Sequence, residues 1–179
     1  DEKVDAMHIK YKKNSFDLVI CSNLVHHLAY PKIFFNNVSK ILKNNGYLLI
    51  QEINCSLAMR FVLRVMRHEG WSFNTNPFDI TVPCNDPEDP WSANCAIPKL
   101  LFDNEAKFRQ NIHFFQIIEQ KFSEFMILPL SGGVVAKAKT INLPYNLLTV
   151  IDSIDEALTY LFPNLFAMQR RIVLKNKKL

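Results

Sequence analysis

The sequence is poor in glycine, which limits how it can bind a nucleotide. Four of the 179 residues are glycine, about 2%, against roughly 7% in an average protein. No Gly-x-Gly occurs anywhere in the chain. A glycine-rich loop, which lets the backbone approach a phosphate closely, is therefore excluded as a binding device within these residues.

Long apolar runs, paired cysteines and strong charge are also missing. No stretch reaches the roughly 18 apolar residues of a membrane-spanning helix, and we expect no signal peptide. Cys21, Cys55, Cys84 and Cys95 form no C-x-x-C pair, so we expect reduced thiols, a cytoplasmic location and no metal site. The net charge is only +4 and forms no basic stripe, so we expect no nucleic acid partner. Nothing in the pattern specifies an oligomeric state.

The chain has ample material for a core. Apolar residues make up 49% of it and aromatic residues 12%, while charged residues account for 21%. This composition is typical of a folded domain rather than a disordered chain. We expect one domain over residues 1–179.

The first fifty residues predict a strand, a helix and a second strand. Residues 16–21 are nearly all apolar, as in a strand buried on both faces. Pro31 stands at a helix start, and Gly46 is suited to the left-handed cap that ends this helix. Residues 47–50 form a second apolar run. This order predicts a crossover in a parallel sheet.

The later elements are more varied. We expect a helix over residues 56–69 that ends at Gly70, with an apolar face made of Leu57, Phe61, Val62, Val65 and Met66. A strand is expected near residues 114–125, a helical insert over 126–168 with a helix from Pro144, and a last strand near 170–175. The predicted fold is α/β: a partial doubly wound, Rossmann-like, mainly parallel sheet with a late antiparallel strand and helical inserts.

A set of short motifs in the first third of the chain resembles one family. They are Val4-Asp5-Ala6, Ser15-Phe16-Asp17-Leu18-Val19-Ile20, Asn23-Leu24-Val25-His26-His27-Leu28 and Val38-x-x-Ile41-Leu42-Lys43-x-x-Gly46-Tyr47-Leu48-Leu49-Ile50. In this order and spacing they resemble the second half of a class I S-adenosylmethionine-dependent methyltransferase. The resemblance implies S-adenosylmethionine as cofactor.

Two departures from the family pattern concern the start of the domain and one turn. The family's glycine-rich first motif and the acidic residue that holds the ribose are absent, and they would lie before Asp1. We therefore expect a fragment, an N-terminally truncated domain that binds the cofactor weakly by itself. Asn44-Asn45-Gly46 replaces the usual Pro-Gly-Gly turn.

The resemblance assigns two groups of residues to the cofactor. Asp5, with Ala6 and Met7, would recognise the adenine edge, because a carboxylate accepts from the exocyclic amine. Asp5 is otherwise a solvated turn residue. Ser22, Asn23 and Leu24 follow a buried strand and would face the methionine half of the cofactor. Ser22 or Asn23 also suits a helix N-cap.

Candidate acceptor-side residues lie in two places. His27 or His26 could take a proton from the acceptor as a general base, or the pair could pack and bond to the backbone. Residues 71–98 hold five prolines and no periodicity, so we expect a lid or substrate segment. Trp71, Trp91 and Asn94 are its candidate substrate contacts, or else ordinary packing residues.

These observations together favour methyl transfer from S-adenosylmethionine to a small-molecule or glycan-like acceptor. The alternative is a non-catalytic methyltransferase-like subunit that binds a partner through an exposed half-sheet. A nicotinamide-dependent dehydrogenase fits less well, because neither the histidine pair nor the late strand order requires one.

Overall fold

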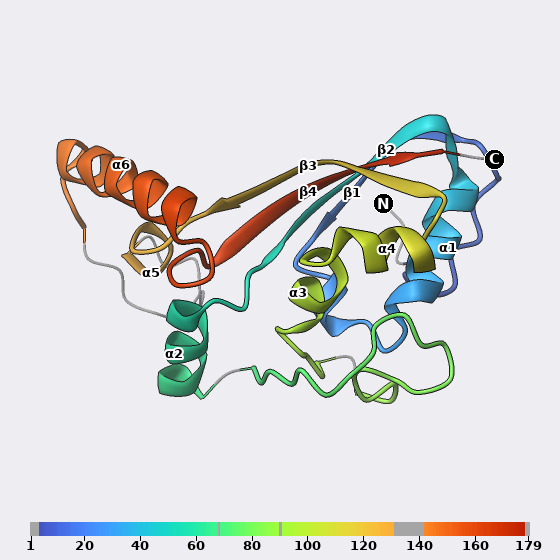
Figure 1. The fold of residues 1–179 in the computed structure, drawn as a ribbon, viewed down its shortest axis with the longest axis horizontal. Helices are drawn as coiled ribbons and strands as arrows, with labels where there is room; N and C mark the ends of the chain where they lie inside the picture. The colour runs from blue at the N-terminus through green and yellow to red at the C-terminus, as the bar shows by residue number, and fades with distance from the viewer. Residues whose placement is uncertain (1–3, 68, 90, 131–141, 178–179) are drawn as a thin grey trace.

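A four-stranded sheet organises the chain. The computed structural model describes residues 4–67, 69–89, 91–130 and 142–177. The strands β1 (Phe16–Ser22), β2 (Leu42–Ile53), β3 (Phe115–Ser123) and β4 (Gln169–Asn176) lie in the order β1-β2-β4-β3 (Figure 1). β1 pairs with β2 in parallel, and β4 runs antiparallel to both β2 and β3. Three strands thus share one direction and the last opposes them, as predicted.

One face of the sheet carries the main core. Leu48, Ile50, Ile172 and Leu174 are fully buried on it. α1 (Pro31–Ile41), α3 (Ile97–Phe102) and α4 (Glu105–Asn111) cover this face (Figure 1). An aromatic cluster joins them, in which Phe35 contacts the rings of Phe102, Phe108 and Phe115. α1 begins at Pro31 as predicted and provides the crossover from β1 to β2.

The role predicted for Gly46 is wrong. α1 ends at Ile41 and its cap, Leu42, is already extended, so the helix passes into β2 without a left-handed residue. The positive φ of 62° in this turn belongs to Asn45. Gly46 is needed for space, because an added Cβ would lie 3.0 Å from the Asp17 carbonyl oxygen and 3.1 Å from that of Lys43.

The helix α2 (Leu57–Met66) also differs from its prediction. Ser56 caps it by accepting a hydrogen bond from the Met59 N–H, and it ends at Arg67, whose φ is 50°. Gly70 therefore does not terminate it. The helix buries Met59 and Leu63, while Phe61 is 70% exposed, so most of the predicted apolar face points outward.

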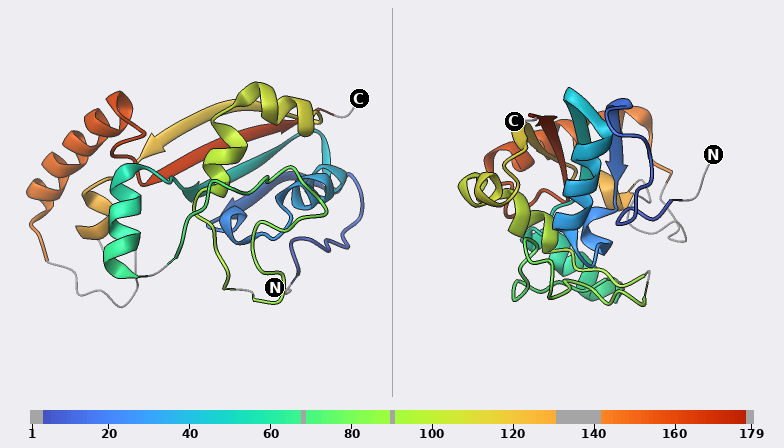
Figure 2. Two further views of the ribbon diagram at one scale, coloured as in Figure 1. Left: turned by 60° about the horizontal axis from the view of Figure 1, so that its bottom comes forward. Right: turned by 90° about the vertical axis from the view of Figure 1, so that its right-hand side faces the viewer.

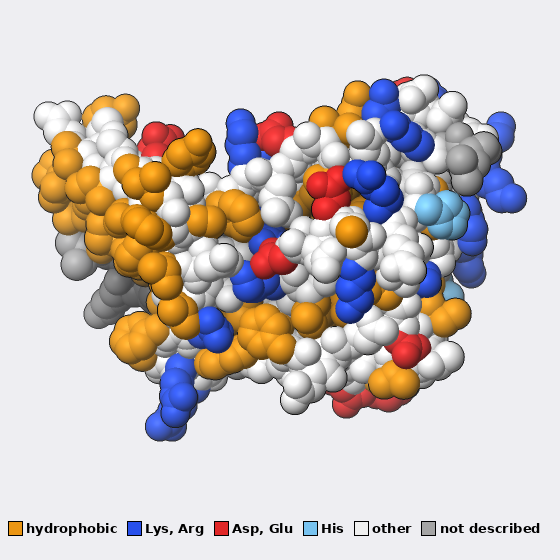
Figure 3. Space-filling view, in the orientation of Figure 1, with side chains coloured by type: hydrophobic (Ala, Val, Ile, Leu, Met, Phe, Trp, Pro, Cys, Tyr) orange, Lys and Arg blue, Asp and Glu red, His pale blue; other side chains and the backbone are white. Residues whose placement is uncertain are grey.

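Three helices gather where β2 ends. α2 lies there with α5 (Ile127–Leu130) and α6 (Tyr145–Leu161), away from α1 at the other end of the sheet (Figure 2). The helices α5 and α6 fall in the predicted insert 126–168, of which residues 131–141 lie outside the described residues. Hydrophobic side chains are exposed over α6 and α2 (Figure 3). No helix among the described residues is long and apolar enough to cross a membrane.

The proline-rich segment is held against the body by backbone hydrogen bonds. Between residues 71 and 96 its described part contains no helix or extended strand, only the bridge between Gly70 and Asn94. The Cys84 N–H donates to the Ala29 carbonyl at 2.8 Å, and the Asn94 N–H donates to the His26 carbonyl at 2.9 Å. The segment therefore packs beside the turn that follows β1.

Candidate functional site

The site begins where β1 ends. Asn23 adopts a left-handed conformation with φ of 46°, and its N–H donates to the Gln51 carbonyl of β2 at 2.9 Å. Asparagine tolerates this conformation better than most residues. The chain then turns into a short 3-10 helix, η1 (Val25–His27). Ser22, Asn23 and Leu24 therefore lie at the carboxyl edge of the sheet, as predicted.

Glu52 anchors this turn from β2. Its side chain is fully buried. One carboxylate oxygen accepts from the Val25 N–H at 2.7 Å and the His26 N–H at 3.3 Å, and the other accepts from His26 Nδ1 at 2.5 Å. Glu52 was not among the predicted site residues. Its signal in the sequence is a carboxylate two residues after the apolar run 47–50.

His26 lies between two carboxylates. Its Nε2 is 3.4 Å from Glu69 Oε2, and its side chain is 4% exposed. Burial lowers the pKa of His26, but the hydrogen bonds and charges of Glu52 and Glu69 outweigh it and raise the pKa to about 9. The hydrogen bond from His26 in turn lowers the pKa of Glu69 to about 2. At neutral pH the pair is therefore an imidazolium and a carboxylate.

His27 is the more accessible of the two histidines, with 23% of its side chain exposed. Its Nδ1 lies 3.1 Å from the Ser92 carbonyl, and a carbonyl can only accept, so Nδ1 carries the proton. In the neutral ring, Nε2 then holds a lone pair, and this atom is 3.8 Å from Glu69 Oε1. The centroids of the His26 and His27 imidazole rings lie 4.1 Å apart.

Asp5 forms a turn with Met7 and His8 in the segment that precedes β1. One oxygen accepts from the Met7 N–H at 2.8 Å and the other lies 2.7 Å from His8 Nδ1. The hydrogen bond with His8, and then that from Met7, lower the pKa of Asp5. Because 54% of the side chain is exposed, each oxygen keeps a lone pair that a ligand can reach.

An apolar hollow of about 320 Å³ lies beside this turn. Ala6 and Leu24 both line it, together with Val4, Cys21 and Phe34. The Asn37 amide donates to the Met7 carbonyl at 2.8 Å and fixes the turn against α1. An apolar hollow next to a charged acceptor fits the adenine end of S-adenosylmethionine, so the first predicted group is compatible with that cofactor.

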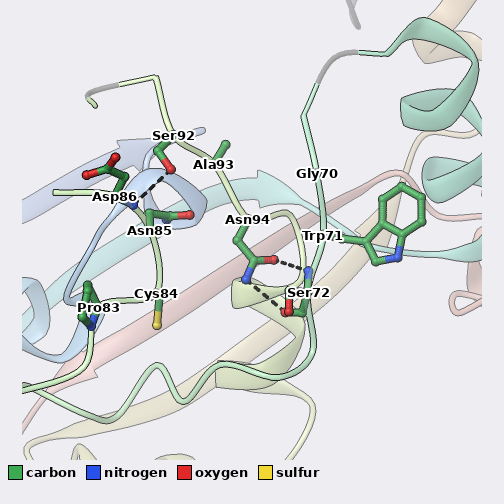
Figure 4. Close-up of a pocket in the computed structure, with 10 residues that line it drawn as sticks. All are labelled: Gly70, Trp71, Ser72, Pro83, Cys84, Asn85, Asp86, Ser92, Ala93 and Asn94. Atoms are coloured by element: carbon green, nitrogen blue, oxygen red, sulfur yellow. Dashed lines mark hydrogen bonds between the residues drawn. The ribbon is translucent and has the colours of Figure 1, made fainter. Parts of the chain in front are cut away.

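The predicted substrate residues occupy different environments. Trp71 and Asn94 line a hollow of about 510 Å³ formed by residues 70–72, 83–86 and 92–94, but the Trp71 indole points away from Asn85 and Asp86 (Figure 4). The Asn94 side chain is used within the protein, since it accepts from the Ser72 N–H and donates to the Ser72 carbonyl. Trp91 is 84% exposed and does not line this hollow.

Comparisons with known proteins agree with this architecture. A family model described as a methyltransferase domain matches residues 2–50. An uncharacterized protein of Methanocaldococcus jannaschii is 42% identical over 50 residues, 28% of this chain and 22% of that protein. A highly reducing polyketide synthase of Calcarisporium arbuscula is 29% identical over 89 residues, 50% of this chain and 3% of that protein.

A solved structure shares the fold. It is a SAM-dependent methyltransferase from Archaeoglobus fulgidus, with 20% identity and a TM-score of 0.51, and the alignment covers 98% of this chain and 66% of that one. The chain thus spans less than two thirds of each of these three proteins. The predicted resemblance is confirmed: residues 2–50 match the methyltransferase domain family, and the chain has the fold of a class I S-adenosylmethionine-dependent methyltransferase.

Proposed function

We propose that the chain takes part in methyl transfer from S-adenosylmethionine to a small-molecule or glycan-like acceptor. The observation that carries the proposal is the cluster of His26, His27 and Glu69 next to buried Glu52, at the carboxyl edge of β1 and β2. In open α/β sheets, ligands bind at this edge. The two histidines of the cluster follow Leu24 with only Val25 between, and Leu24 shares a hollow with Ala6 from the N-terminal turn.

The cofactor residues would be those of the two groups at the β1 end. Asp5 would accept from the adenine amine, with Ala6 and Met7 along the ring edge. Ser22, Asn23 and Leu24 would hold the methionine half. When bound, S-adenosylmethionine supplies an electrophilic methyl group on a sulfonium ion. The chain's own contribution is to align the acceptor and keep water away from it.

His27 would accept the acceptor's proton at Nε2. Its Nδ1–H is held by the Ser92 carbonyl, so the lone pair is directed away from that backbone. The cation that forms would be stabilised by the Glu69 carboxylate 3.8 Å away. His26 would act as a positioning residue, because its charge holds Glu69 beside His27.

Within the predicted segment 71–98, residues 71–96, which precede α3, would form the acceptor side as a lid. Trp91 presents an almost fully exposed indole that a planar or sugar acceptor could stack on. Trp71 would form part of the wall of the hollow of about 510 Å³, and Asn94 would hold that wall in place through its hydrogen bonds with Ser72.

A binding role is the second candidate. Leu18 and Ile20 are 49% and 65% exposed on β1, opposite the face that α1 covers. An exposed apolar strand of this kind suits a partner that covers the half-sheet.

Product formation separates the two candidates. The full gene product that contains this chain would be incubated with S-adenosylmethionine and panels of hydroxyl, amine and glycan acceptors, and S-adenosylhomocysteine would be measured. We expect acceptor-dependent turnover, with kcat lowered about 10²- to 10⁴-fold by His27→Asn. His113→Asn, at an exposed histidine, is the matched control. Cofactor binding without turnover on any acceptor would favour the binding role.

A further inference from the structure

Three side chains with metal-binding atoms converge beside η1. The ligand atoms of His26, His27 and Glu69 all lie within 4.8 Å of one another, and this is the one such group among the residues the structure describes. Two of the separations are 3.4 Å and 3.8 Å, from the Nε2 atoms of the histidines to the two Glu69 oxygens. Tetrahedral zinc with bonds of about 2.0–2.1 Å places its ligand atoms about 3.4 Å apart. Small side-chain rotations therefore suffice to bring the three ligand atoms to bonding distance of one zinc ion.

Both imidazoles are already oriented by their other nitrogen. His26 Nδ1 is bound to Glu52 Oε1 at 2.5 Å, and His27 Nδ1 donates to the Ser92 carbonyl. Each ring consequently directs Nε2 toward Glu69. Outer hydrogen bonds to a carboxylate or a carbonyl are what orient the histidine ligands of metal sites.

The backbone holds the three ligands from separate parts of the chain. Glu52 fixes η1 through the Val25 and His26 N–H groups. Glu69 precedes Gly70, whose carbonyl accepts from the Cys95 N–H at 3.0 Å. The His26 side chain is buried, while those of Glu69 and His27 are 18% and 23% exposed. An ion can therefore enter from the side of Glu69 and His27.

We propose that His26, His27 and Glu69 bind a divalent transition metal ion, zinc in the first instance. Two imidazoles and one carboxylate are the donors of known three-ligand zinc sites, and they leave a fourth position for water or another oxygen ligand. Each imidazole binds as the neutral ring, and any proton on Nε2 leaves to solvent. The cysteine pattern could not reveal this site, because its donors are not thiols.

The metal site does not depend on methyl transfer. The metal would use the same Nε2 lone pair that His27 would use to accept a proton, so the metal-bound form cannot carry out proton acceptance at His27. Zinc is therefore expected to inhibit turnover, and chelator-treated protein is expected to be active.

Calorimetry on untagged, chelator-treated protein tests the proposal. Titration with Zn²⁺ should show one ion bound per chain. His27→Asn and Glu69→Gln should each weaken binding more than about 100-fold, and Glu52→Gln about 10- to 100-fold through the outer hydrogen bond. His113→Asn should bind zinc as the unaltered protein does. Co²⁺ should give the strong visible absorption of a four-coordinate site, and circular dichroism checks that each variant is folded.

Two results would overturn the inference. One is unchanged zinc affinity in folded His27→Asn and Glu69→Gln. The other is loss of binding in Cys95→Ala, whose thiol donates to Glu69 Oε2 at 3.3 Å, while both ligand variants still bind. Methyl transfer without zinc binding would refute the metal site alone, and zinc binding without methyl transfer would refute the proposed function alone.

Discussion

Replacing Glu52 by Gln should destabilise the protein far more than the loss of an ordinary ion pair. The buried carboxylate accepts from Val25 and His26 N–H groups at 2.7 and 3.3 Å and from His26 Nδ1 at 2.5 Å. Glutamine preserves the shape and one acceptor, but it replaces the other oxygen by an NH₂ group and removes the charge. Breaking a buried pair by removing one charged partner costs about 3–5 kcal/mol. We expect Glu52→Gln to lower the free energy of unfolding by about that amount.

Urea denaturation followed by circular dichroism measures this change. Glu105→Gln is the matched control, since Glu105 pairs with Arg109 at 2.6 Å but both side chains are more than half exposed. The control should lose no more than about 1 kcal/mol. Equal losses in the two variants, or a Glu52→Gln loss below about 1 kcal/mol, would refute the view that Glu52 anchors the site.

Two further predictions concern pH and the lid. Burial and then the charges of Asp152 and Asp155 raise the pKa of Glu124. Ionised Glu124 therefore opposes folding, and stability falls as pH rises from its unfolded pKa through its folded pKa. Glu124→Gln should stabilise the protein at pH 7 and flatten this dependence, and a destabilised variant with the original slope would contradict it. Trp91→Ala in the full gene product should raise the acceptor KM while leaving cofactor affinity unchanged. A lower melting temperature with an unchanged acceptor KM would contradict the proposal that this segment is a lid.

The sequence predicted the crossover because its physical signals are local. An apolar run, a proline at the helix start and a second apolar run determine β1, α1 and β2 with little help from the rest of the chain. The face of α2 was not predictable in this way. Its apolar stripe is real, but the protein buries the side that carries Met59 and Leu63, and that choice depends on contacts with distant residues such as Cys95 and Met168.

The candidate site was predicted in part for the same reason. Residues 22–24 lie at the end of β1 and residues 5–7 precede this strand, so motif order along the chain marks both groups. Glu52 and Glu69 become site residues only when folding brings them to His26 and His27. The spacing between these residues along the chain carries no sign of that proximity.

The measurement that tests the central claim most directly is a titration of S-adenosylhomocysteine into isotope-labelled protein, followed residue by residue by NMR. In the full gene product we expect saturable shifts of the amides of residues 5–7 and 22–24. Asp5→Ala should weaken binding by about 1–3 kcal/mol, the cost of leaving a buried donor unpaired. Asp17→Ala, at an exposed carboxylate paired with Lys43, should bind normally. Saturable shifts that cluster elsewhere, or no shifts at all, would contradict the account.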